Sequence, residues 1–326
     1  MQFQKIQKNK PAIILAPMEG ITDVIFREVL TSFGGYNHCV TEFIRVSQEP
    51  LPAKVFKRKA PELLKNSKTK SGIFVQVQLL GGHPERVALS AKAAVEAGAL
   101  AVDLNFGCPA PTVNKNDGGA SLLRDPKRLE QIIREVKSIV PKNVAVSAKL
   151  RLGWDNGDDI FNNIVHAAQG GADWITIHAR TRMQGYMPPA YWQKIGEAKK
   201  QVDVPVVANG EIWTVDDFKR CQEITGCEHF MLGRGALADP LLVLKVLRHE
   251  NQNNSLNWVT LIQMLSDTAK LYLNDEDYSR YTLKRSKQWL KYAKMSMDYQ
   301  KIDFKLFDHI KKSTSIESLF SILHTG

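Results

Sequence analysis

The feature that most constrains this chain is a regular alternation of short apolar runs with longer amphipathic stretches. Eight apolar, β-branched runs recur: Ala12–Ala16, His38–Glu42, Ile73–Leu79, Ala101–Asn105, Val144–Leu150, Trp174–His178, Val204–Ala208 and His229–Leu232. Apolar residues at helical spacing occupy most of the intervals: Pro84–Ala97, Asp125–Val140, Asp158–Gln169, Val215–Thr225 and Ala236–His249. The first set predicts strands and the second predicts helices.

Eight strand-to-helix alternations favour an α/β protein with a (β/α)8 TIM barrel rather than an open doubly wound sheet. The alternative is a Rossmann-type sheet, but no GxGxxG follows the first run. The 326 residues suit one large domain, alone or with a small one.

The pattern changes after His249. Glu250–Asn257 is polar and Asn-rich, which is typical of a linker. Four segments with helical spacing follow it: Trp258–Leu273, Tyr278–Met297, Phe304–Lys311 and Ile316–Leu323. We therefore expect a barrel over residues 1–249 and a small all-α domain over residues 250–326.

Several classes of protein are excluded by composition. No window approaches the ~18 uncharged apolar residues of a membrane span, and the apolar run before Pro17 is shorter than the ~7–15 residues of a signal-peptide core. Four cysteines without a CxxC pair indicate neither a disulfide framework nor zinc. We expect a soluble, cytoplasmic protein that binds no metal and no membrane, and acts as a monomer.

The charge is strongly basic, with 44 Lys and Arg against 34 Asp and Glu and a net charge of +10. Either a polyanionic partner or merely a soluble basic surface accounts for this excess. Two segments concentrate it. One predicted helix carries Arg280, Lys284, Arg285, Lys287, Lys291 and Lys294 near three aromatic residues, and the connection after the second run carries Lys54, Lys57, Arg58, Lys59, Lys65, Lys68 and Lys70 with only Glu62 among them.

Polar and small residues gather where the predicted strands end, the place where TIM barrels build active sites. These are Ala16-Pro17-Met18 with Thr22-Asp23, Gln76 and Gln78, Asn105 to Pro109, Lys149, His178 to Thr181, Asn209-Gly210-Glu211 and Gly233-Arg234-Gly235. Cys108 stands off the strand between Gly107 and Pro109, so its thiol is a candidate nucleophile or acid. We interpret Cys39, Cys221 and Cys227 as inert core residues.

Two of these segments also have plain structural interpretations. The first is equally a Pro/Gly turn with a helix cap, and Gly233–Gly235 is equally a helix entry with a surface Arg. Glycines and an Arg after the last strand nevertheless suit the phosphate site of a TIM barrel. Together with an interior Lys149 and with amides around a planar ring, they predict a flavin mononucleotide (FMN) barrel.

In order and spacing these motifs resemble the tRNA-dihydrouridine synthases, which reduce the 5,6 double bond of uridine in tRNA. The resemblance rests on Ala16-Pro17-Met18, Thr41-Glu42, Gln78 to Gly81, Asp103-Leu104-Asn105-Phe106-Gly107-Cys108-Pro109, Gly118 to Ala120, Lys149 to Gly153, His178 to Thr181, Asn209-Gly210 and Gly233 to Gly235. Phe106 departs from the family pattern, where a smaller or polar residue is common. The segments around Thr41, Trp154, Trp213 and Trp289 are most similar to bacterial subfamily C, which acts on uridine 16 of the D-loop.

The resemblance implies a role for each site residue. Cys108 is the acid that protonates C5 of uracil. FMN is bound by Ala16, Pro17, Met18, Gln78, Asn105, Lys149, His178, Asn209, Gly210, Glu211, Gly233 and Arg234. Arg180 and Tyr186 approach the uracil, and Arg280, Lys284, Arg285 and Lys287 contact tRNA. NADPH is the implied electron donor.

Three other interpretations stay open at this level. The chain is alternatively an FMN-dependent reductase of a free pyrimidine or an enone, although the basic helical tail is unnecessary for a small substrate. It is alternatively a synthase for another tRNA position, such as 20. The third is a tRNA-binding scaffold without flavin, which leaves Cys108, Lys149 and Arg234 without a shared purpose.

Overall fold

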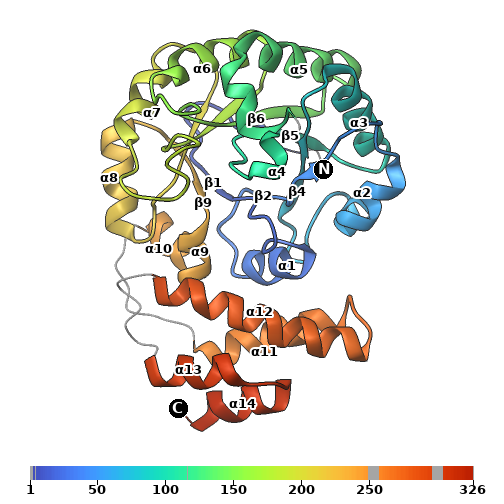
Figure 1. Ribbon diagram of the computed structural model, residues 1–326, viewed down its shortest axis with the longest axis vertical. Helices are drawn as coiled ribbons and strands as arrows, with labels where there is room; N and C mark the ends of the chain where they lie inside the picture. Colours follow the sequence, from blue (N-terminus) through green and yellow to red (C-terminus); the bar gives the residue numbers. More distant parts are fainter. Residues whose placement is uncertain (1–2, 4, 116, 249–256, 296–303, 326) are drawn as a thin grey trace.

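The barrel predicted from the alternation is present. The computed structural model describes residues 3, 5–115, 117–248, 257–295 and 304–325. Its eight parallel barrel strands are β1 (Ala12–Leu15), β2 (His38–Val40), β4 (Phe74–Leu80), β5 (Ala101–Phe106), β6 (Ala145–Arg151), β7 (Trp174–His178), β8 (Val206–Asn209) and β9 (His229–Leu232). The ring closes because β1 pairs with β9 on one side and β2 pairs with β4 on the other (Figure 1).

One strand was not predicted. β3 (Ile44–Arg45) has only two residues and adds to the end of β4 outside the ring. So short an element has no periodicity to detect, and its pairing depends on a neighbour more than thirty residues later in the chain.

Helices surround the barrel on its outer side (Figure 1). The longer ones are α1 (Val24–Ser32), α2 (Ala53–Lys59), α3 (Pro84–Glu96), α5 (Pro126–Ile139), α6 (Asp159–Gln169), α7 (Trp192–Lys199) and α8 (Val215–Thr225). The other elements in the connections are η1 (Pro61–Lys65), α4 (Pro111–Asn114), η2 (Gly119–Arg124), α9 (Arg234–Ala238) and α10 (Leu242–Arg248). Local sequence fixes several starts, as where Thr214 and Asp217 form a capping box for α8.

The single helix predicted over Ala236–His249 was wrong. It is divided into α9 and α10 at Asp239 to Leu241. Pro240 lacks a backbone N–H, and it forces the preceding Asp239 into an extended conformation with φ −133° and ψ 96°.

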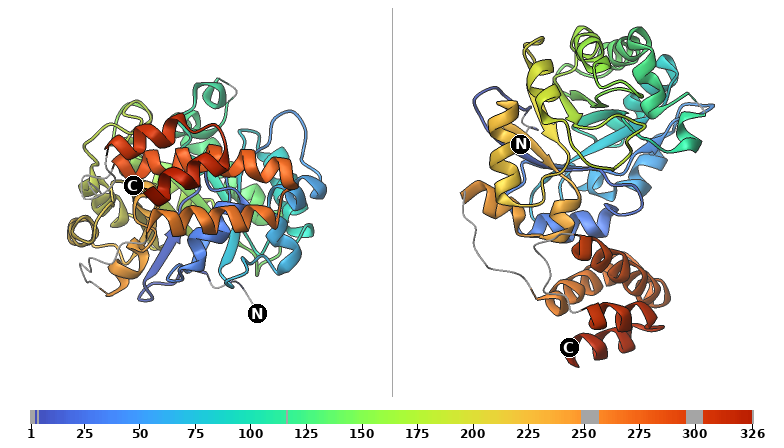
Figure 2. Two further views of the ribbon diagram at one scale, coloured as in Figure 1. Left: turned by 90° about the horizontal axis from the view of Figure 1, so that it is seen from below. Right: turned by 60° about the vertical axis from the view of Figure 1, so that its left-hand side comes forward.

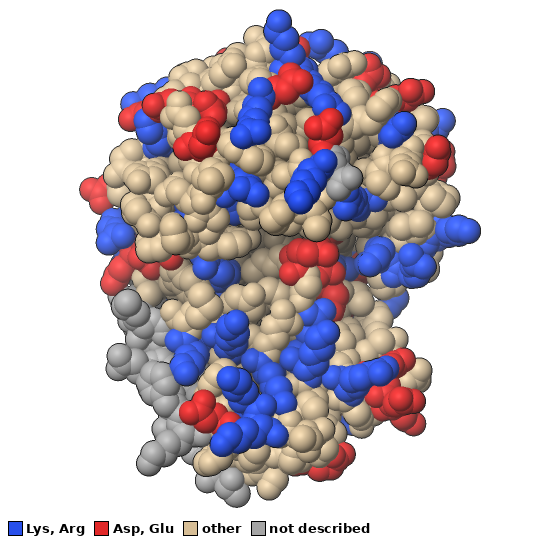
Figure 3. Space-filling view, viewed as in Figure 1, with Lys and Arg blue, Asp and Glu red and all other residues tan. Residues whose placement is uncertain are grey.

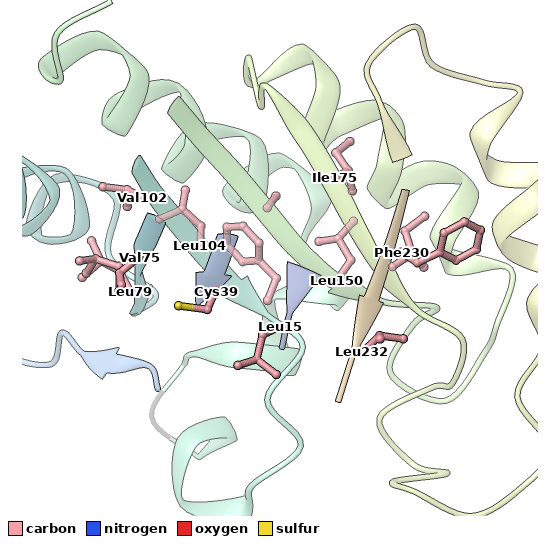
Figure 4. Packing of buried hydrophobic residues seen from close by; sticks show 14 of the residues in the cluster. Leu15, Cys39, Val75, Leu79, Val102, Leu104, Leu150, Ile175, Phe230 and Leu232 are labelled. Carbon is pink, nitrogen blue, oxygen red and sulfur yellow. The ribbon is translucent and has the colours of Figure 1, made fainter. Parts of the chain in front are cut away.

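Alternation along the strands gives the barrel two apolar layers. Outward-facing residues such as Val77, Leu104 and Ile175 pack against the helices, and Figure 4 shows Leu104 and Ile175 among their neighbours on adjacent strands. Inside the barrel, Ile14, Trp174 and other residues form a second apolar cluster, joined by Phe3 from the N-terminal segment. The polar inward residues that follow along each strand belong to the site described below.

The C-terminal segment is helical, as predicted. It contains α11 (Trp258–Lys270), α12 (Asp275–Met295), α13 (Phe304–Lys312) and α14 (Ile316–Thr325), which form a separate lobe beside the barrel (Figures 1 and 2). Ile262, Leu290, Ile310 and Leu319 belong to an apolar cluster of its own. The predicted boundary at residue 249 and almost all of the linker Glu250–Asn257 lie outside the described residues. In the described ranges, none of the helices is long and apolar enough to cross a membrane.

The lobe is attached to the barrel by buried aromatic and charged contacts. Trp289 of α12 is 1% exposed, packs edge-on against Phe26 of α1 and donates from Nε1 to Leu237 O at 2.8 Å. Asp23, which caps α1, accepts from Tyr281 Oη at 2.8 Å and from Arg285 Nη2 at 2.7 Å. Helix α12 is therefore fixed against the loop that follows β1.

Because Trp289 connects the two parts, Trp289→Ala should destabilise the protein by about 3–5 kcal/mol, as for other large-to-small changes of fully buried aromatic residues. Urea denaturation followed by circular dichroism measures the change. Lys284→Ala, on the exposed face of the same helix, should stay within about 0.5 kcal/mol of the wild type. Equal losses in both variants would contradict this account of the docking.

Candidate active site

A cavity of about 540 Å³ opens at the carboxyl ends of the barrel strands, beneath α12. This volume is in the usual range of about 300–1,000 Å³ for small-ligand and cofactor sites. All twelve predicted cofactor residues line it: Ala16, Pro17, Met18, Gln78, Asn105, Lys149, His178, Asn209, Gly210, Glu211, Gly233 and Arg234. Cys108 and Tyr186 line it too. Closure of the barrel thus brings together residues from seven separate segments of the chain.

Register explains why the polar residues meet at one level. Asn105 lies opposite Lys149 across β5 and β6, and His178 lies opposite Asn209 across β7 and β8. Gln76 lies one inward position earlier on β4 than Gln78, and its amide nitrogen donates to Val102 O and Ser147 Oγ. The amide nitrogen of Gln76 therefore finds its partners within the protein and needs none from a ligand.

The Cys108 loop is held at its backbone. Asn105 Oδ1 accepts from the backbone N–H groups of Gly107 and Cys108, each at 2.9 Å. Arg151 Nε donates to Gly107 O at 2.8 Å. The Cys108 side chain is half-buried, and burial raises the pKa of its thiol despite the nearby Arg151 and Lys149. The thiol is therefore protonated near neutral pH, so it has a proton to donate.

Lys149 brings a buried cation to the cavity wall. Its Nζ lies 3.1 Å from Asn209 Oδ1, and Asn209 in turn donates to Met231 O at 2.8 Å. Burial, followed by the charge of Arg151, lowers the pKa of Lys149. An anionic group bound here would offset that unfavourable environment.

His178 is neutral in this surrounding. Burial and the charges of Arg151, Lys149, Arg180 and Arg234 hold its pKa well below the usual range. Within the described residues, its Nδ1 is buried and has no hydrogen-bond partner. The protein thus leaves one buried polar atom of a cavity-lining ring unsatisfied.

Arg180, which we expect to approach the uracil, is not among the residues that line the cavity. Its side chain is fully buried, forms a short ion pair with Glu211, and donates from Nε to Met187 O at 2.7 Å. Glu211 also accepts from Trp213 Nε1 at 2.9 Å and pairs with Arg234 at 3.2 Å. Arg180 therefore acts on the cavity through its ion pair with Glu211 and through its charge, which helps to lower the pKa of His178.

Tyr186 is an exposed aromatic side chain at the mouth of the cavity. Two guanidinium groups lie near its ring, with Arg151 at 5.2 Å and Arg234 at 4.9 Å from the ring centroid. Cation–π attraction to both groups positions the ring and leaves part of it free for a ligand.

The wall contributed by α12 was missed from sequence. Lys291, Tyr292 and Met295 line the cavity together with barrel residues. The sequence placed the first two on a basic helix, but only docking of that helix shows that they reach a site built more than 50 residues earlier.

The basic helix does not present all its charges to solvent. Arg285 forms an ion pair with Asp23 and donates to Gly20 O, and Lys287 donates to Ser313 O at 2.5 Å. These two expected tRNA contacts are therefore engaged within the protein. Lys284 and Arg280 are exposed, although Arg280 pairs with Asp277 at 2.6 Å. Figure 3 shows Lys and Arg gathered over the helical lobe, below a hollow between lobe and barrel.

The second basic segment also differs from expectation in one respect. Glu62 is buried and paired with Arg27 at 2.7 Å, so it does not offset the lysines around it. Lys68 and Lys70 lie over the rings of Phe74 and Tyr272. Lys54, Lys57, Arg58, Lys59 and Lys65 are exposed.

The remaining cysteines, Cys39, Cys221 and Cys227, are buried. No group of three or more His, Cys, Asp and Glu residues suited to a metal ion occurs in the part of the chain that the structure describes.

Comparison with known proteins agrees with this geometry. The profile of the family Dihydrouridine synthase (Dus) matches residues 14–321. The tRNA-dihydrouridine(16) synthase of Pseudomonas putida is 46% identical over 283 residues, covering 85% of this chain and 86% of that protein. The enzyme of the same name from Aquipseudomonas alcaligenes is 42% identical and covers 95% of this chain and 98% of its own.

Solved structures show the same fold at low sequence identity. Histamine dehydrogenase from Rhizobium sp. 4-9 has a TM-score of 0.58 at 13% identity, covering 82% of this chain, and this chain spans half of the dehydrogenase. The old yellow enzyme homologue from Zymomonas mobilis has a TM-score of 0.52 at 12% identity, covering 81% of this chain and 94% of that one.

The environment of Cys108 predicts a pH profile. Because burial raises the pKa of its thiol, iodoacetamide should alkylate Cys108 with a midpoint above the value of about 8.5 for a free cysteine. Peptide mass spectrometry at a series of pH values measures this rate. Cys39, which is buried, should stay unmodified in the native protein. A Cys108 midpoint below 8 would show that Arg151 and Lys149 outweigh burial.

Proposed function

Because this chain belongs to the dihydrouridine synthase family, we propose that it reduces the C5–C6 double bond of uridine 16 in the tRNA D-loop to 5,6-dihydrouridine, with FMN as cofactor and NADPH as electron donor. One observation carries the proposal: a protonated thiol, Cys108, shares a cavity with Lys149 and Asn105, and a basic helix of the C-terminal lobe forms part of the same wall. A small-molecule reductase has no use for such a wall.

The residues present fit FMN. Lys149 supplies a cation for an electron-rich ring, and His178 lines the same cavity as a neutral imidazole. Gly233 and Arg234 place a backbone turn and a guanidinium where a phosphate binds in TIM barrels. When bound, FMN supplies the hydride for the reduction.

Near Arg234, two glycine positions do not tolerate a side chain. Gly210 has φ +110°, and a Cβ on Gly235 would lie 2.2 Å from Ile212 O. Glu211, which also lines the cavity, pairs with Arg234 at 3.2 Å, so the guanidinium is oriented before any ligand arrives. This end of the cavity is therefore preorganised for an anion.

Cys108 supplies the proton in the proposed reaction. Hydride addition at C6 of uracil leaves negative charge on the C5 side, and the thiol donates its proton to C5. Its raised pKa keeps that proton on sulfur until the base is in place. Asn105 and Arg151 hold the loop that carries it.

The tRNA must present its uridine out of the stack, at a cost of a few kcal/mol. Exposed basic residues of two helices offset this cost through phosphate contacts, with Lys284 and Lys291 on α12 and Lys57 and Arg58 on α2. Position 16 is supported by the names of the relatives that match most of the chain. We also propose that the protein acts on its tRNA as a monomer, in the cytoplasm.

The reaction and its position are tested together. Purified protein incubated with NADPH and unmodified tRNA should form dihydrouridine at position 16, mapped by mass spectrometry. Cys108→Ala should keep FMN and tRNA binding but lose activity by about 10²–10⁴-fold, the usual contribution of a general acid. Reduction at position 20 would reassign the tRNA orientation, and efficient turnover of free uridine would favour a small-molecule reductase. Full activity of Cys108→Ala would exclude the thiol as the acid.

The phosphate assignment gives a separate expectation. Arg234→Ala should release FMN on dialysis, read as loss of the flavin absorbance, because the variant removes a charge-assisted hydrogen bond to the phosphate. Arg220→Ala serves as the control, since Arg220 is exposed on α8 and does not line the cavity. An Arg234→Ala protein that stays as yellow as the control would contradict the assignment.

A further inference from the structure

A chain of side-chain hydrogen bonds runs from the centre of the barrel to the Cys108 loop. Ser147 Oγ donates to Asp103 Oδ1 through a short hydrogen bond, and Gln78 Nε2 donates to Asp103 Oδ2 at 2.6 Å. Asn105 Nδ2 donates to Gln78 Oε1 at 2.8 Å. Asn105 Oδ1 then accepts from the backbone N–H groups of Gly107 and Cys108.

The direction of this chain is fixed at both ends. A backbone N–H can only donate, so Asn105 must turn its oxygen toward the loop and its nitrogen toward Gln78. Gln78 must then present its oxygen to Asn105 and its nitrogen to residue 103. Only an acceptor at position 103 completes this arrangement, and an ionised carboxylate accepts without donating.

Asp103 itself takes no direct part in the cavity. It is 1% exposed and does not line the cavity, whereas Gln78 and Asn105 do. Burial raises the pKa of its carboxyl, against the effect of Ser147, Gln78 and Lys149. Burying a carboxylate at such a site costs desolvation free energy, and an apolar residue of similar size would fill the space without that cost. Packing alone therefore does not explain why an Asp stands here.

We propose that Asp103 is a positioning residue that sets the orientation of the Gln78 and Asn105 amides and, through them, the backbone position of the Cys108 thiol. This inference rests on the proposed function only for the role of that thiol. The side chain at position 103 must supply a hydrogen-bond acceptor to Gln78, and it need not be charged.

Three variants separate these requirements. Asp103→Leu removes the acceptor and frees Gln78 and Asn105 to turn. Asp103→Asn keeps one acceptor, because its Oδ1 can receive Gln78 Nε2 while its Nδ2 donates to Ser147 Oγ. Ser147→Ala removes the other partner of Asp103 but leaves the path to Cys108 intact, so it is the matched control.

Two readouts are taken on the flavin-bound, full-length protein: dihydrouridine formation in tRNA, and the rate at which iodoacetamide alkylates Cys108. Asp103→Leu should lower dihydrouridine formation by about 10²-fold, the usual effect of displacing a reacting group by about 1 Å. It should also raise the alkylation rate, because a released loop exposes the half-buried thiol. Asp103→Asn and Ser147→Ala should stay within a few-fold of the wild type in both.

Other results overturn the proposal. Wild-type activity and alkylation rate in Asp103→Leu would show that the path does not position Cys108. A loss in Asp103→Asn as large as in Asp103→Leu would show that charge matters rather than an acceptor. If Asp103→Leu is not recovered with flavin, Asp103→Ala removes the acceptor without adding bulk. If the wild type forms no dihydrouridine, the proposed function fails, while the alkylation rates still decide the role of Asp103.

Discussion

The closed ring of parallel strands is the constraint on which the rest of the molecule depends. Because each strand pairs with two neighbours, half of its side chains must enter a narrow interior, and that interior cannot be left empty. Ile14, Val207 and Met231 fill its lower part, and Phe3 packs beneath them. Above them the same alternation places Gln78, Asn105 and Lys149 at one end, where their polar atoms need partners. The active site is thus the part of the barrel interior that apolar packing does not fill.

Burying so much polarity has an electrostatic consequence. Lys149, Arg151, Arg180 and Arg234 all act on His178, and together they hold it neutral. Glu211 offsets two of these guanidinium groups directly. The cavity remains rich in positive charge, which suits an electron-rich cofactor with a phosphate group better than a neutral ligand. The same charge limits what burial alone does to the Cys108 thiol, since Arg151 and Lys149 favour its ionised form.

Apolar spacing was enough to predict the barrel and the helical lobe, and the polar strand ends were enough to predict the barrel's share of the cavity wall. Those features are local or repeat along the chain. Arg180 could not be placed, because whether an Arg after β7 faces the cavity or Glu211 depends on a contact between neighbouring strand ends. Arg285 and Lys287 carry the same positive charge on the same helix as Lys284, so the sequence does not distinguish them. In the structure, however, Arg285 pairs with Asp23, the cap of α1, and Lys287 donates to Ser313 O. The break between α9 and α10, in contrast, can be predicted from the sequence, because Pro240 lies inside the expected helix and lacks a backbone N–H.

Helix α12 has two faces with different roles. One face docks on the barrel: Trp289 donates to Leu237 O, and Tyr281 and Arg285 donate to Asp23. Residues on another face, Lys284 and Lys291, stay exposed. Since Lys291 also lines the cavity, the helix surface is continuous with the site. Docking therefore does more than attach the lobe: the packing of Trp289 against the barrel fixes where Lys291 lies relative to Cys108 in the cavity wall.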